Sequence, residues 1–379
     1  MFVMRARLPA QFISFGASAF FTILCVTSAG VLRADELTLT PMEVETLQQC
    51  AFSTEALSCG ASDVRKRLEG QTGSEVMGLY SRNLTEGACH TLGHIVGRHV
   101  FKRSHDVEKS MEECGYTCDG SCIHGIAGAA FLEALDIEPV KAEEMHIDSE
   151  LIHLEGRSLC ATSRAVCHGI GHMLYLLHNS FREPLRTCDE IASGWSREDC
   201  YRGVFMEHAD IISTNDFILG KSRSVELKED DILYPCDSVT DRYLNACYRY
   251  QPRIQNRIFA DSGVTDAKQR DALRREACEA LSAAYGRSDC FEGIGRSLFE
   301  DALVDPQPVV EWCNNLPRVK DRAACYFGVA RPIASYNRRK EALMFCAKVP
   351  GFYENATCYY ASISAILRNL ALGDTMSKE

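Results

Sequence analysis

Apolar and polar positions follow a helical period along much of this chain, and one pattern returns several times. A typical unit is an amphipathic run that ends at a cysteine, as in "DALRREACEAL". A turn rich in Gly, Pro, Asp and Asn follows, and an apolar, helix-compatible run then begins near a second cysteine. The sequence lacks long alternating stretches of β-branched residues, which argues against a sheet. The pattern therefore predicts an all-α protein built from helix pairs.

Five pairs of cysteines, each 11 or 12 residues apart, mark the repeats. The pairs are Cys188 with Cys200, Cys236 with Cys247, Cys278 with Cys290, Cys313 with Cys325, and Cys346 with Cys358. The repeat length of about 33 to 47 residues is typical of helical arrays. We expect each disulfide to join the end of one helix to the start of the next, with Asp199 and Asp289 as N-caps. About eight such pairs would form an open solenoid or a closed α/α toroid.

Residues 1–34 have the pattern of an export segment. Arg5 and Arg7 precede an uncharged stretch, residues 12–32. This stretch is long for a signal peptide and nearly long enough to span a bilayer, so we expect a cleaved signal peptide or an N-terminal membrane anchor. Without Cys25, which lies in this segment, 18 of the 19 cysteines remain. An even number at this density indicates a disulfide framework, and hence a periplasmic or secreted protein.

Charge limits the kinds of partner. Without the three arginines of the export segment, the chain has 38 basic and 52 acidic residues. We therefore expect no nucleic-acid partner, and contact with a membrane only through the N-terminal segment if it is not cleaved. The charged stretch "GKSRSVELKEDD" predicts a boundary between a histidine-rich half, residues 35–215, and a cysteine-rich half without histidine, residues 216–379.

All 11 histidines lie between residues 90 and 208, although the repeat continues to the C-terminal end. The motif C-H-x-x-G-H occurs twice, as "CHTLGH" from Cys89 and as "CHGIGH" from Cys167. Each copy places two histidines four residues apart, on one face of a helix. Two imidazoles with this spacing can bind one metal ion. The motif therefore indicates a metal site built from two helices.

Aligning the repeats on their glycines places His90, His124 and His168 at one equivalent position in three successive repeats. Later repeats have Arg202, Glu292 and Phe327 there. The candidate metal ligands are His90, His94, His124, His168, His172 and His208. Five or six nitrogen ligands are too many for one structural zinc, and they suit two ions, or iron or copper with some histidines in supporting roles.

The metal is therefore expected to be iron, copper or zinc. Glu207 or Glu133 is a candidate oxygen ligand or general base. If one coordination position stays open, the site would support redox chemistry or hydrolysis by metal-activated water.

Other interpretations stay open. The histidines before glycines can be a packing device in a disulfide-stapled scaffold that binds a peptide or protein on its concave face, without catalysis. The segment "CGYTCDGSC" spaces Cys114, Cys118 and Cys122 four residues apart, which allows a thiol-redox site, although disulfides are their expected use. Cys89 and Cys167 stand one residue away from the usual disulfide position, so we expect them to pair differently or not at all.

The segments "CHGIGH", "CIHG" and "CYRGVFME" resemble those of a group of exported bacterial helical-repeat proteins rich in cysteine and histidine. The resemblance covers most of the chain after the export segment and assigns no activity. The chain is also superficially similar to lanthionine cyclases, α/α toroids that hold zinc with Cys-Tyr-Gly and Cys-His-Gly segments. Here "CHG" begins at Cys167, but "CYRG" at Cys200 contains an extra arginine and lacks the preceding tryptophan. This similarity implies helix starts that face inward, and no function.

Overall fold

The computed structural model describes residues 38–51, 53, 56–137, 148–178, 180–213, 227–228, 231–282, 286–336 and 338–371. The predicted export segment and the predicted boundary near residue 215 lie outside these residues. The described residues belong to one compact unit, which contains both histidine-rich and cysteine-rich stretches. Within them, no helix is both long enough and apolar enough to cross a bilayer.

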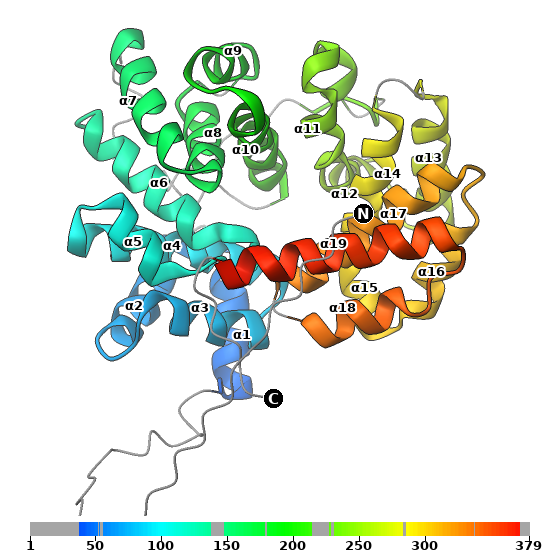
Figure 1. Ribbon diagram of the computed structural model, residues 1–379, viewed down its shortest axis with the longest axis horizontal. Coiled ribbons are helices and arrows are strands. Elements are labelled where there is room, and N and C mark those ends of the chain that lie inside the picture. The colour runs from blue at the N-terminus through cyan, green and yellow to red at the C-terminus, as the bar shows by residue number, and fades with distance from the viewer. Residues whose placement is uncertain are drawn as a thin grey trace, which may run out of the picture. The chain divides into compact units, whose positions relative to one another are not determined.

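The fold is all-α, as the sequence predicts, and the described residues include no strand (Figure 1). The α-helices are α1 Pro41–Ala51, α2 Ala56–Leu68, α3 Gly73–Asn83, α4 Glu86–Ser104, α5 Val107–Cys114, α6 Ser121–Ala134, α7 Ser149–Thr162, α8 Arg164–His178, α9 Arg182–Ile191, α10 Gly194–Ser213, α11 Leu244–Tyr248, α12 Gln251–Asp261, α13 Ala267–Ala280, α14 Arg287–Ser297, α15 Phe299–Val304, α16 Pro306–Asn314, α17 Val319–Ser335, α18 Arg339–Cys346 and α19 Phe352–Ala371. In the part of the chain that the structure describes, three short 3-10 turns join them: η2 Cys118–Gly120, η4 Cys236–Ser238 and η5 Asp241–Tyr243.

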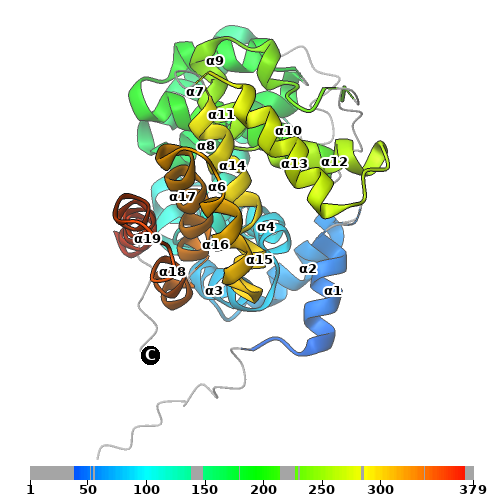
Figure 2. The same ribbon diagram turned by 90° about the vertical axis from the view of Figure 1, so that its right-hand side faces the viewer.

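Inner helices α4, α6, α8 and α10 pack side by side in chain order, and α14, α17 and α19 do the same (Figures 1 and 2). An outer helix, shorter in most cases, precedes each of them. A disulfide joins the outer to the inner helix in the pairs α5–α6, α7–α8, α9–α10, α13–α14, α16–α17 and α18–α19. All five predicted disulfides form: Cys188–Cys200, Cys236–Cys247, Cys278–Cys290, Cys313–Cys325 and Cys346–Cys358. Closing a loop this short restricts the unfolded chain by roughly 3 kcal/mol per bond. The disulfides thus stabilise repeats that are individually too thin to bury a large core.

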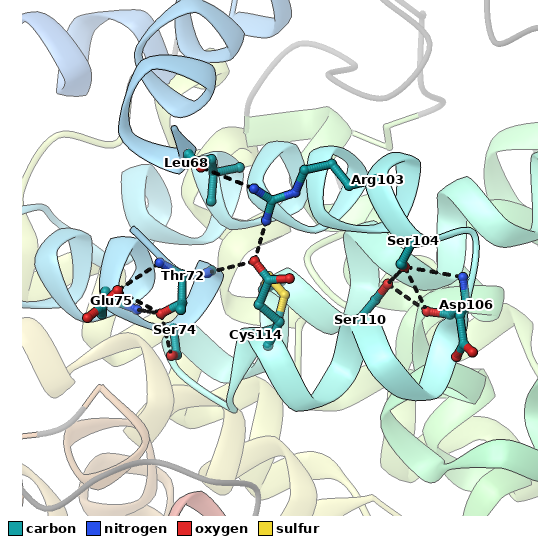
Figure 3. Close-up of polar contacts among 12 residues, drawn as sticks. Leu68, Thr72, Ser74, Glu75, Arg103, Ser104, Asp106, Ser110 and Cys114 are labelled. Atoms are coloured by element: carbon teal, nitrogen blue, oxygen red, sulfur yellow. Dashed lines mark hydrogen bonds and ion pairs between the residues drawn. A yellow bond between two sulfur atoms is a disulfide. The ribbon is translucent and has the colours of Figure 1, made fainter. Parts of the chain in front are cut away.

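Side chains that accept hydrogen bonds from free backbone N–H groups define several helix starts. Thr72 and Glu75 form a capping box at the start of α3 (Figure 3). Asp106 accepts a hydrogen bond from the backbone of Lys109 in α5. The side chain of Arg103, near the end of α4, donates to the carbonyl oxygen of Leu68 at 3.1 Å. Figure 3 shows this contact of α4 with α2, and also Ser104 of α4 bonded to Ser110 of α5 at 2.7 Å.

The prediction that Asp199 and Asp289 cap helices is wrong. Helix α10 starts at Gly194 and α14 at Arg287, so both aspartates lie inside their helices. The carboxylate of Asp199 instead accepts hydrogen bonds from Arg164 at 2.6 Å and from Arg202 at 3.0 Å. The carboxylate of Asp289 accepts from the side-chain amide of Asn245, so both aspartates bind side chains instead of the N–H groups of a helix start.

Neighbouring inner helices touch backbone to backbone at glycines. In α8 and α10 the contact is reciprocal: a Cβ atom on Gly171 would collide with the carbonyl oxygen of Cys200, and one on Gly203 with that of His168. The same reciprocal contact joins α4 to α6 and α14 to α17. The glycines concerned are Gly97 with Gly125, and Gly295 with Gly328. Because only glycine lacks a Cβ atom, these positions fix how closely the inner helices approach.

Polar contacts join the early helices to the late ones. Arg296 of α14 donates to Asp119 in η2 at 2.6 Å and to Glu86, at the start of α4, at 3.3 Å. Arg368 of α19 donates to the hydroxyl of Tyr116 at 3.2 Å. Of the two arrangements that the sequence leaves open, these contacts favour the closed array over the open solenoid.

Candidate metal centre

Five histidine rings from three successive inner helices lie together. His90 and His94 come from α4, His124 from α6, and His168 and His172 from α8. Seven ring pairs among them have centroid distances between 4.5 and 5.6 Å. We call these residues the five-histidine cluster. The two copies of C-H-x-x-G-H thus contribute to one group of side chains, and α6 adds the fifth ring between them.

One ring nitrogen each of His90, His124 and His172 lies within 4.8 Å of the others, and all three residues are buried. In addition, Nε2 of His90 and Nε2 of His94 lie 3.1 Å apart. Two ligands at about 2.1 Å from one ion would have nitrogens about 3.0 to 3.4 Å apart at octahedral or tetrahedral angles. The separation of His90 and His94 therefore fits two ligands of a common ion.

Backbone carbonyls orient two of the rings. Nδ1 of His90 donates to the carbonyl oxygen of Cys118 at 3.1 Å, and Nδ1 of His168 donates to that of Asp199 at 3.0 Å. A neutral imidazole that donates from Nδ1 carries its lone pair on Nε2. Histidines that bind metals commonly have their second nitrogen held in this way. Both rings are therefore set to present Nε2.

Of the two acidic candidates, Glu207 alone lies at the cluster. Its buried carboxylate, on α10, accepts a hydrogen bond from Nδ1 of His172 at 2.6 Å. Glu133 instead pairs with His105 at 2.8 Å, and both side chains are more than half exposed. The hypothesis that Glu133 serves the site is therefore wrong, because its carboxylate is engaged at the surface. Glu207 contacts the cluster through an imidazole that it orients.

Burial keeps four of the five imidazoles uncharged at neutral pH. It lowers the pKa of His90, His94, His124 and His168 well below the ordinary histidine value, and neighbouring histidines lower it further. Nδ1 of His124 and Nε2 of His168 are buried and have no hydrogen-bond partner among the described residues. Neutral imidazole is the form that binds metal ions.

His208, the sixth candidate, lies apart from the cluster. Its Nδ1 is hydrogen-bonded to the hydroxyl of Tyr175 at 2.7 Å, and its ring packs against Phe181 with centroids 4.5 Å apart. Burial lowers its pKa to about 3. The structure therefore places His208 in the aromatic core beside α8.

The glycine contacts revise the alignment of the repeats. The carbonyl oxygen of His94 faces Gly125 as that of His168 faces Gly203. His94 is therefore the equivalent of His168, and His90 lies one helical turn earlier. The sequence alignment is wrong here because the contact glycine of α4 follows the motif instead of lying within it.

The cysteines of the described residues are all in disulfides. The pairs beyond the five predicted ones are Cys50–Cys59, Cys89–Cys118, Cys114–Cys122 and Cys160–Cys167. The two displaced cysteines, Cys89 and Cys167, thus do pair differently. No described cysteine offers a thiol for the redox site that "CGYTCDGSC" allows. Cys167 and Cys200, which match the lanthionine cyclase segments, are likewise oxidised and are not zinc ligands here.

A cavity of about 340 Å³ adjoins the cluster. His124 and His168 belong to the cluster and also line the cavity. Its polar lining is dominated by arginines from four different helices and the segment after α11. These are Arg164, Arg202, Arg249, Arg331 and Arg368. The sequence patterns predict no role for Arg249, Arg331 or Arg368. A signal existed for Arg331: it follows Gly328 by three residues, as His172 follows Gly169.

Comparisons with known proteins add no analogy. The chain matches no protein-family model, no curated protein and no solved structure. The five-histidine cluster and the arginine-lined cavity are therefore the features that bear on function.

Proposed function

We propose that this chain is an exported metalloprotein whose five-histidine cluster binds one or two transition-metal ions. The observation that carries the proposal is the convergence of buried imidazole nitrogens from three helices, with Nδ1 of three rings already donated to protein acceptors. A buried polar atom without a partner costs about 1–3 kcal/mol. A metal ion would give Nε2 of His168 and Nδ1 of His124 the partner that the described residues do not provide.

The ligand set suits zinc, copper or iron, because imidazole is a good ligand for all three. The first shell would consist of neutral nitrogen donors, so it would leave the positive charge of the ion uncompensated. Glu207 would moderate that charge through His172, as carboxylates behind metal-bound histidines do. A bound ion would supply Lewis acidity or redox chemistry.

The disulfides indicate an oxidising environment outside the cytoplasm. The proposal adds that the chain is periplasmic or secreted, with residues 1–34 as its signal peptide or membrane anchor. Metal loading would then take place after export, when the disulfides have formed.

The test is elemental analysis of protein exported to an oxidising compartment and purified without chelators or a histidine tag. We expect about one or two equivalents of a transition metal per chain. His168→Ala/His172→Ala and His90→Ala variants should lose it, since each removes converging nitrogens. His105→Ala and His153→Ala should keep it, because these histidines pair with surface carboxylates.

A protein without metal that also fails to take up zinc, copper or iron in reconstitution would overturn the proposal. Circular dichroism and thermal unfolding of each variant separate loss of metal from loss of fold. Unchanged folding and no metal would favour the remaining hypothesis, a scaffold that binds a peptide or protein partner.

A further inference from the structure

The arginines of the cavity differ in how well their charges are neutralised. Arg202 donates to Asp199 at 3.0 Å, and Arg249 donates to Glu292 at 2.9 Å. The guanidinium of Arg331 has no hydrogen bond and no ion pair with any described residue. Its Cζ atom lies over the ring of Phe327, 5.9 Å from the ring centroid. Arg164 donates to Asp199 as well, so three of the five arginines are paired with carboxylates, and Arg331 is not.

Arg368 lacks a carboxylate as well. Its guanidinium donates to the phenol oxygen of Tyr116 at 3.2 Å and lies over the same ring. The two acidic residues of the lining do not neutralise Arg331 or Arg368, because Asp119 is bound by Arg296 and Asp199 by Arg164. Positive charge therefore exceeds negative charge on the side of the cavity that α17 and α19 form.

This excess opposes folding. Burial lowers the pKa of Arg331 to about 10, and the nearby guanidinium groups of Arg249 and Arg368 add to the effect. Several like charges gathered in a partly closed space cost free energy unless an anion joins them. Glu292 and Asp119 offset this cost only in part.

We propose that the cavity binds a small molecule with a phosphate or carboxylate group, which Arg331 and Arg368 hold. The planar guanidinium group offers paired N–H donors that match both kinds of oxyanion. A volume of about 340 Å³ fits a small metabolite but not a folded partner. Met111 and Tyr250 give the same lining an apolar part for the rest of the molecule.

The inference goes beyond the metal site, because the arginines would bind the anion with or without an ion in the cluster. His124 and His168 belong to both linings, so a ligand in the cavity would lie beside the cluster. If the cluster is loaded, this ligand becomes the candidate substrate or metal ligand.

The test is calorimetric titration of the full chain with inorganic phosphate and, separately, with succinate. We expect at least one of the two to bind. Arg331→Gln and Arg368→Gln should each weaken its binding by at least about tenfold, since each removes charge-assisted hydrogen bonds. Arg82→Gln, which changes an exposed arginine outside the cavity, should leave the dissociation constant unchanged. Binding of phosphate alone or of succinate alone would identify the oxyanion class.

The proposal is overturned if neither anion binds below about 10 mM, or if the Arg331 and Arg368 variants bind as tightly as the unaltered chain. Repeating the titration after removal of metal by a chelator keeps the two proposals separate. Binding that persists in the stripped protein belongs to the arginines. Binding that disappears with the metal and ignores the arginine variants would place the anion on the ion and refute the arginine site. Arg331→Gln should fold, because it removes a charge without a carboxylate partner, and Arg368→Gln gives an independent second variant.

Discussion

Helices α8, α14 and α17 use one packing rule and present different chemistry. In each, a glycine that packs against the preceding helix (Gly169, Gly293 or Gly328) is followed three residues later by a different side chain: His172, Arg296 or Arg331. His172 is bound by Glu207, Arg296 by Asp119, and Arg331 by no described carboxylate. The comparison teaches that the glycines determine the scaffold, while this one position determines whether a repeat contributes a metal ligand, an ion pair or an anion-binding cation.

The largest effect should be a difference in the free energy of unfolding between variants of Arg296 and of Arg331. Burial would raise the pKa of Asp119, but Arg296, Arg249 and Arg331 hold it below its ordinary value. Arg296→Gln would leave that buried carboxylate without its ion-pair partner and should lower the free energy of unfolding by about 3–5 kcal/mol. Arg331→Gln should change it by less than about 0.5 kcal/mol, or raise it. Urea unfolding of both variants with disulfides intact measures this, and equal losses would show that Arg331 is structural too.

The next effect tests whether the contact glycines stabilise the helices of the histidine cluster and the helices of the arginine side equally. Gly171→Ala and Gly295→Ala each direct a Cβ atom at a carbonyl oxygen of the next inner helix, so each should destabilise the protein by about 3 kcal/mol. Gly171→Ala alone should also lower metal content, because it displaces α8. Gly70→Ala is the matched control, since its Cβ atom would meet nothing within 4 Å. Stable Gly171 and Gly295 variants would contradict the close backbone contact.

A smaller effect should be confined to the histidine side. Glu207→Ala removes the acceptor that orients His172 and should weaken metal binding by about 10- to 100-fold. Glu207→Gln should recover part of that loss, because its amide oxygen can still accept from Nδ1. Competition titrations with a chromophoric chelator give the affinities. Glu133→Gln should leave metal affinity unchanged, and anion binding should be unaffected in all three variants.

The smallest effect is a dependence of stability on pH that the region without histidine lacks. The pKa of His208 is about 3 in the folded protein, against roughly 6.5 in an unfolded chain. Below pH 6.5 the unfolded state therefore takes up a proton that the folded state refuses, and stability is lost as the pH falls. The slope is roughly 1.4 kcal/mol per pH unit for this residue. Between pH 5.5 and 7 the free energies of unfolding of the unaltered chain and of His208→Gln should diverge by roughly 1 kcal/mol. Parallel curves would argue against a buried neutral His208.

Much of the fold follows from the sequence because its signals are local. The 11- and 12-residue spacing of the paired cysteines and the amphipathic runs depend only on neighbours in the chain, and both the helix pairs and the five disulfides are as expected. The convergence of both C-H-x-x-G-H motifs also follows, since repeats place equivalent positions on the same side.

The rest depends on contacts between distant segments. The alignment of His90 is off by one helical turn because several glycines lie close together in α4. Only the packing of α6 shows that Gly97 is the one in the backbone contact. The sequence does not reveal the proposed anion site, because Arg331 and Arg368 come from repeats without histidine and Arg368 meets Tyr116 across 252 residues of chain. Asp199 was expected to cap a helix because its competing partner, Arg164, lies in another repeat.

The order of the disulfides along the chain has a consequence for biogenesis. Of the nine disulfides among the described residues, seven join cysteines that are consecutive in the sequence, so a chain that oxidises as it crosses a membrane from its N-terminal end forms them by default. The other two interleave, because Cys89 bonds to Cys118 across Cys114, which bonds to Cys122. The first partner that Cys89 meets is therefore the wrong one. A chain oxidised in this order would need disulfide isomerisation in the segment whose Cys118 carbonyl holds His90, so the histidine cluster would mature later than the other repeats.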